Sequence, residues 1–95
     1  MNEYTIIWGR WQIEHIRERH DISREEFVEA WHDRLERLDV WLMHGEHGPY
    51  CESFGYTNDL RFLKLIWRWQ EQHGKAVWPI TAHPADPPLI GREQR

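Results

Sequence analysis

The feature that most constrains the fold is a helix start at Ser23. Ser23 is a preferred N-cap residue, and Glu26 three positions later completes a capping box. Ile22 and Phe27 flank this cap with the spacing of a hydrophobic staple. We therefore predict a helix over 24–33. Its predicted buried stripe consists of Phe27, Val28 and Trp31.

A second helical pattern ends just before this start. Over 10–20, the residues Ile13, Ile16 and His20 recur at intervals that place them on one helix face. Only the short break 21–23 separates the two predicted helices. The chain is therefore expected to turn a tight corner there, and His20 is expected to lie at that corner.

Patterns typical of strands flank the two helices. The β-branched and aromatic run 4–8, followed by glycine, predicts a first strand. After the second helix the hydrophobic period changes to two. Four further strands are predicted, over 35–43, 50–57, 60–70 and 75–83. The run 60–70 is apolar on both sides, as in a central strand. Pro79 places the last strand at a sheet edge or at a bulge.

This order of elements predicts an α+β fold. An N-terminal strand is followed by two short helices and then by a four-strand antiparallel meander, with the helices packed on one sheet face. The length of 95 residues predicts one domain over 1–86, and the prolines near the end predict an extended or disordered C-terminal tail over 87–95. The single Cys51 cannot form an internal disulfide and is expected to be a small sheet residue.

Six of the seven tryptophans are expected to divide into two groups. Core positions are predicted for Trp8, Trp31 and Trp67. Partial exposure is predicted for Trp41, Trp69 and Trp78. Exposed aromatics on a sheet can stack nucleobases, although they more often mark a protein–protein surface.

Composition also bears on location and partners. The first residues lack a charged leader with an apolar core, and no apolar run approaches the roughly 18 residues that span a bilayer. We therefore expect a cytoplasmic protein without membrane contact. The formal net charge of −4 argues against strong nonspecific nucleic-acid binding, but it leaves room for a local basic cleft.

Three segments in sequence order resemble the BrnT family of bacterial toxins. They are "IEHIRERHDISREEFVEAW", "FGYTNDLRFLKLIW" and "VWPITAHPA", and the likeness covers residues 4–86. The resemblance implies a RelE-like fold and the toxin role in a type II toxin–antitoxin pair. It also implies RNA cleavage without a metal or other cofactor, and neutralisation by a cognate antitoxin protein.

The resemblance extends to single residues. His20 matches the family histidine at the helix corner, and Arg61 matches the arginine that opens a strand. His83 stands where the family has arginine, and Asp21 stands where glycine usually follows the histidine.

Cleavage by 2′-OH attack needs a base, an acid and cations at the phosphate. Histidine can exchange protons near pH 7, and arginine binds phosphate through its fork. The predicted catalytic residues are His20, His83, Arg61 and Lys64. The predicted RNA- and phosphate-binding residues are Arg17, Arg19 and Arg68.

Each of these residues also has a structural interpretation. His20 would be favourable at a helix C-terminus simply by interacting with the helix dipole, and Arg17 and Arg19 would suit a solvated helix face. A metal site is not expected. His15 and His20 are five residues apart, which is the wrong spacing for one helix face. His44 and His47 could approach each other across a hairpin, but they have no third ligand nearby unless Cys51 folds back.

The alternative function is a catalytically inactive protein-interaction module on the same scaffold, which would bind a partner through exposed tryptophans. The antitoxin, and RNA if the chain is active, are the expected partners. A homodimer and a hetero-oligomer with the antitoxin both stay open.

Overall fold

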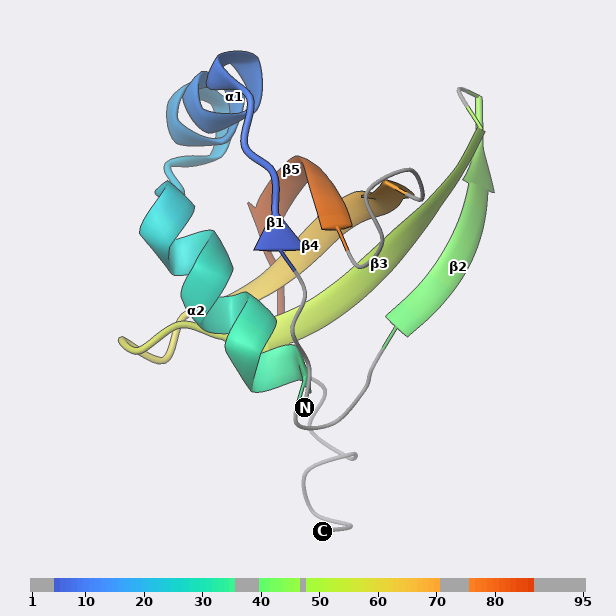
Figure 1. Cartoon of the computed structure of the whole chain (residues 1–95). Coiled ribbons are helices and arrows are strands. Elements are labelled where there is room, and N and C mark those ends of the chain that lie inside the picture. The colour runs from blue at the N-terminus through green and yellow to red at the C-terminus, as the bar shows by residue number, and fades with distance from the viewer. Residues whose placement is uncertain (1–4, 36–39, 47, 71–75, 87–95) are drawn as a thin grey trace, which may run out of the picture.

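A computed structural model of the chain describes residues 5–35, 40–46, 48–70 and 76–86 (Figure 1). The expected tail 87–95 lies outside the described residues. The elements in chain order are β1 (Thr5–Ile6), α1 (Arg10–His20), α2 (Arg24–Leu35), β2 (Val40–Gly45), β3 (Gly48–Tyr56), β4 (Phe62–Gln70) and β5 (Ala76–Pro84). The predicted α+β class with two helices is confirmed. Neither helix has the length and apolar character that crossing a bilayer requires.

The strands form one mixed five-stranded sheet in the order β1-β5-β4-β3-β2. The strands β2 to β5 pair antiparallel with their neighbours in sequence. The short β1 adds a parallel pair, with Thr5 opposite Ala76 and Ile6 opposite Val77. The prediction gave 4–8 a longer strand and did not place it in the sheet. The observed strand covers Thr5–Ile6, and the N–H of Ile7 still donates to the carbonyl of Val77 at 2.8 Å before the chain reaches α1 at Arg10, whereas Tyr4 lies outside the described residues.

The first hairpin differs from the prediction at its turn. The prediction ended the strand at residue 43, whereas β2 continues so that His44 pairs with Pro49 and Gly45 pairs with Gly48. The turn between β2 and β3 is therefore shorter than the turn predicted from the glycine-rich segment. Gly48 has a φ of 105°, a conformation that side chains disfavour, and this freedom lets the strands pair close to the turn.

The prediction placed the last strand at a sheet edge or Pro79 at a bulge. β5 is not an edge strand, because it lies between β1 and β4, and Pro79 instead lies beside a register shift of the β4–β5 ladder. Trp67 lies opposite Pro79, while the neighbouring Ile66 lies opposite Thr81, so Ile80 is the additional residue. Proline has no N–H to donate to a ladder, and a bulge releases the strand from that requirement. β4 lies between β3 and β5, which confirms it as a central strand.

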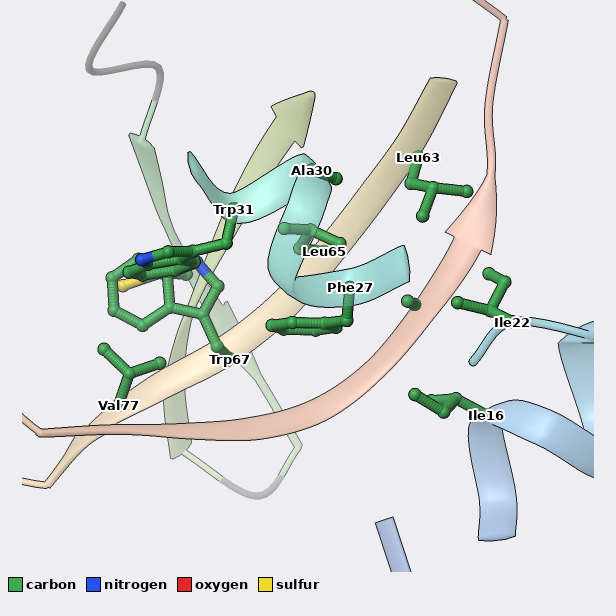
Figure 2. Close-up of a cluster of buried hydrophobic side chains, with 11 residues drawn as sticks. Ile16, Ile22, Phe27, Ala30, Trp31, Leu63, Leu65, Trp67 and Val77 are labelled. Carbon is green, nitrogen blue, oxygen red and sulfur yellow. The ribbon is translucent and has the colours of Figure 1, made fainter. Parts of the chain in front are cut away.

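The core lies between the two helices and one face of the sheet (Figure 2). Trp31 of α2 meets Trp67 of β4 edge to face, with ring centroids 5.0 Å apart. The buried cluster comprises Ile16, Ile22, Phe27, Ala30, Trp31, Cys51, Leu63, Leu65, Trp67, Val77 and Ala82. Trp8 is half-buried and packs edge-on against Phe27.

The remaining expectations on tryptophan and cysteine can be placed on this core. Trp69 is exposed and Trp78 is half-buried, as predicted, whereas the side chain of Trp41 lies outside the described part of the structure. Cys51 is buried on β3, which confirms it as a small sheet residue.

Candidate functional site

The end of α1 fixes the position of His20, its last residue. Asp21, which follows, adopts the left-handed conformation with φ 55° and ψ 44°. The N–H groups of Asp21 and Ile22 donate to the carbonyls of Arg17 and Ile16, each at 3.1 Å. This arrangement satisfies free carbonyls at the helix end and turns the chain sharply. Asp21 therefore does what a glycine commonly does at this position.

The start of α2 completes the corner. The predicted capping box is present, because the N–H of Ser23 donates to Glu26 Oε1 at 3.0 Å and the N–H of Glu26 donates to Ser23 Oγ at 3.1 Å. Arg61 joins this corner to the beginning of β4. Its guanidinium donates to the carbonyl of Asp21 at 2.9 Å and to that of His20 at 3.4 Å. It also pairs with the Glu26 carboxylate at 3.2 Å.

Three imidazoles gather where α1 packs against β5, and we call His15, His20 and His83 the histidine cluster. The rings of His20 and His83 meet edge to face with centroids 4.3 Å apart. The ring of His15 lies 5.7 Å from that of His20. The exposed indole of Trp11 stacks on His15 at 4.6 Å and 13°. Two segments far apart in sequence thus contribute rings to one surface site.

The surroundings favour the neutral form of both central imidazoles. Burial lowers the pKa of His20 below 6.5, and the charges of His15 and Arg19 lower it further. Burial also lowers the pKa of His83. The positive charges of His20, Lys64 and His15 act in the same direction, and Glu52 opposes them in part. Adding a proton to His20 or to His83 is therefore less favourable than adding one to a free imidazole.

Lys64 and Glu52 border the cluster on the sheet. Lys64 lies directly opposite His83 in the β4–β5 ladder, so both side chains leave the same sheet face. The Lys64 ammonium lies 4.0 Å from the Glu52 carboxylate, a loose contact for an ion pair. Lys64 is therefore a cation next to His83 whose charge is only partly balanced.

The structure thus brings three of the four predicted catalytic residues together, namely His20, His83 and Lys64. The fourth, Arg61, is close to His20 but differs from the expectation, because its guanidinium is held by Glu26 and by two backbone carbonyls. It holds the corner in place rather than facing the cluster as a free cation.

The predicted RNA-binding arginines are spread more widely. Arg19 is exposed and close enough to His20 to influence its pKa. Arg17 lines a separate cavity between the helices, together with Ile13 and Ser23. Arg68 lies on β4 four residues beyond Lys64, which is about 13 Å along a strand. Only Arg19 therefore borders the histidine cluster.

Sequence reasoning did not assign His15, Trp11 or Glu52 to the site. Spacing alone argued against His15 as a neighbour of His20, yet His20 is the last helical residue and its ring reaches back to His15. The one-turn spacing of Trp11 and His15 could have indicated their stack. The place of Glu52 beside Lys64 depends on the register of β3 against β4, which the local sequence pattern does not specify.

The arrangement can bind an anion and move a proton, since it combines imidazoles, an ammonium and an arginine. Within the described ranges, no group of three or more His, Cys, Asp or Glu side chains has the geometry to hold a metal ion. No protein-family model and no curated protein matches the chain, so its functional assignment depends on the chemistry of the histidine cluster.

Proposed function

We propose that the chain is the toxin of a type II toxin–antitoxin pair, similar to BrnT toxins and with a RelE-like arrangement, and that it cleaves RNA in the cytoplasm without a metal. The observation that carries this proposal is the edge contact between His20 and His83, with ring centroids 4.3 Å apart. An acid and a base placed together are what RNA cleavage by 2′-OH attack requires.

The protonation state of the His20–His83 pair suits this reaction. The charge of His20 lowers the pKa of His83, so a proton on His20 disfavours a proton on His83 and favours a state in which the pair holds one proton. In that state the neutral ring accepts the proton of the 2′-OH, and the protonated ring donates a proton to the leaving 5′-oxygen. The 2′-oxygen forms a bond to phosphorus while the bond to the 5′-oxygen breaks. The products are a 2′,3′-cyclic phosphate and a 5′-OH.

The bound phosphate completes the site. Its negative charge raises the proton affinity of His20 and His83 and so favours protonation of one imidazole of this pair. Lys64 lies beside His83 and stabilises charge on the phosphate, with Glu52 orienting the ammonium until RNA displaces it. Arg61 acts as a positioning residue that fixes the backbone of His20.

Purified protein incubated with RNA and excess EDTA tests this proposal. Wild type should cleave, and the new ends should be 2′,3′-cyclic phosphate and 5′-OH. His20→Gln and His83→Gln should each reduce the rate by about 10²- to 10⁴-fold, the usual contribution of a general acid or base. His44→Gln is the matched control, because His44 is exposed on β2.

Circular dichroism should show that all three variants keep the wild-type fold. Absence of cleavage by folded wild type would refute the proposal. Cleavage at an unchanged rate in both His20→Gln and His83→Gln would refute the roles assigned to the two imidazoles.

The second candidate function is a catalytically inactive interaction module. It is favoured by exposed apolar side chains away from the histidine cluster, namely Leu42, Leu60 and Trp69, which are 63%, 78% and 41% exposed. Expression in bacteria separates the two candidates. A nuclease toxin should arrest growth in a His20-dependent manner, and co-expressed antitoxin should restore growth. An interaction module should bind its partner without affecting growth.

A further inference from the structure

Trp11 is an aromatic side chain that the proposed chemistry leaves without a role. It is 63% exposed, although an indole is usually well covered in a folded domain. The ring is nevertheless ordered by contact, since one of its faces lies nearly parallel to His15 at 4.6 Å. Such a stack orients the indole before any ligand binds, so little side-chain entropy is lost on binding.

The position of this indole connects it to the histidine cluster. Trp11 and His15 are one helical turn apart on α1 and share a face. A ring contact of 5.7 Å joins His15 to His20. A group stacked on Trp11 would therefore be a short distance from a phosphate bound at His20 and His83.

The neighbours of Trp11 indicate what kind of group this is. Its neighbours one position before and three positions after it on α1, Arg10 and Glu14, are exposed and charged. Arg10 and Glu14 pair with each other at 3.9 Å. The indole is 63% exposed, and the histidine cluster to which its stack on His15 leads has Arg19 and Lys64 close by. An exposed aromatic ring close to cationic side chains is the arrangement on which single-stranded nucleic acids stack their bases.

We infer that Trp11 is the stacking platform for an unpaired nucleobase, and that the histidine cluster therefore takes single-stranded RNA. Bases inside a duplex have both faces covered by their neighbours, whereas an unpaired base can place a face on the indole. The inference relies on the proposed function for the place of the phosphate. The selectivity for single strands follows from the stack.

The test is binding of a fluorescently labelled 2′-O-methyl oligoribonucleotide, which lacks the attacking hydroxyl and cannot be cleaved by the proposed route. Wild type should bind the single strand more tightly than the same strand annealed to its complement. Trp11→Leu, which keeps apolar volume but removes the ring, should weaken single-strand binding by about 5- to 150-fold, the range for loss of one base stack. Trp11→Phe should recover part of the affinity. Leu42→Ala is the matched control, because Leu42 is also 63% exposed and lies on β2.

The outcomes separate this inference from the proposed function. Trp11-dependent binding without cleavage of ordinary RNA would support the platform and refute the nuclease. Cleavage with equal single-strand affinity in wild type and Trp11→Leu would support the nuclease and overturn the platform, leaving the indole to a protein partner. Equal affinity of wild type for single strand and duplex, or no binding at all, would also overturn it.

Discussion

Replacing Arg61 tests whether its guanidinium holds the helix corner or binds phosphate. It contacts the carbonyls of Asp21 and His20 and the carboxylate of Glu26 at 2.9, 3.4 and 3.2 Å. Hydrogen bonds to charged groups contribute roughly 1.5–3 kcal/mol each, although the contact with the Asp21 carbonyl is exposed and the other two are only partly buried. The side chains of Arg61 and Glu26 keep 31% and 24% of their surface exposed, which weakens the ion pair. We therefore expect Arg61→Met to lower the free energy of unfolding by about 2 kcal/mol.

The matched variant is Arg61→Lys. A lysine keeps the positive charge and can pair with Glu26, but it has no fork to reach two carbonyls as well. If Arg61 holds the corner, Arg61→Lys should still lose about 1 kcal/mol, and kcat should fall with little change in KM because His20 is displaced. If Arg61 binds phosphate, Arg61→Lys should retain activity and Arg61→Met should raise KM.

Urea unfolding of the wild type and both variants supplies the stabilities. Arg24→Met is the control, because Arg24 is exposed and its contact with Glu25 is loose at 3.8 Å. The free energy of unfolding of this variant should stay within about 0.5 kcal/mol of the wild-type value. Stabilities of Arg61→Lys and Arg61→Met that are both within that margin would refute the role of Arg61 at the corner.

Three further predictions follow from the same structure. Asp21→Gly should raise the free energy of unfolding by about 0.5–1 kcal/mol in urea, because φ at this residue is 55° and the carbonyl that Arg61 contacts is kept; a loss of stability would contradict this. Phe27→Ala should cost about 3–5 kcal/mol, measured by denaturant or thermal unfolding, because the ring is fully buried; a cost under 1 kcal/mol would contradict the packing of the core. Stability should fall as pH is lowered from 7.5 to 5.5, because the folded-state pKa values of His20 and His83 lie below 6.5 and the unfolded chain then binds more protons. Urea unfolding across this range should show a shallower fall in His83→Gln but not in the exposed control His32→Gln, and equal slopes in the two variants would count against the cluster.

The parts of the fold that were predictable depend on nearby residues. The start of α2 follows from Ser23 and Glu26, whose hydrogen bonds span three positions. The position of β1 in the sheet could not be predicted from nearby residues. Its pairing of Thr5 with Ala76 joins the two ends of the domain and spans only two residues, so no local periodicity marks it.

The same distinction applies to the candidate site. His20 was identifiable because it ends a helix at a recognisable corner. Its contact with His83 was suggested by the family resemblance, not by any pattern in the chain. The loose pairing of Glu52 with Lys64 arises from the register of β3 against β4, which depends on tertiary packing. The role of Arg61 in holding the corner could not be predicted, because it depends on which backbone carbonyls lie within reach of the guanidinium.

The order of the sheet has a consequence for the timing of synthesis. β5 follows all the other strands in sequence, yet it lies between β1 and β4. While a ribosome is still making the segment before residue 76, β1 has no strand to pair with and His20 lacks the imidazole of His83. Emergence of β5 therefore completes both the pairing of β1 with the rest of the sheet and the contact between His20 and His83, so any activity that depends on this histidine pair begins only after β5 has been made.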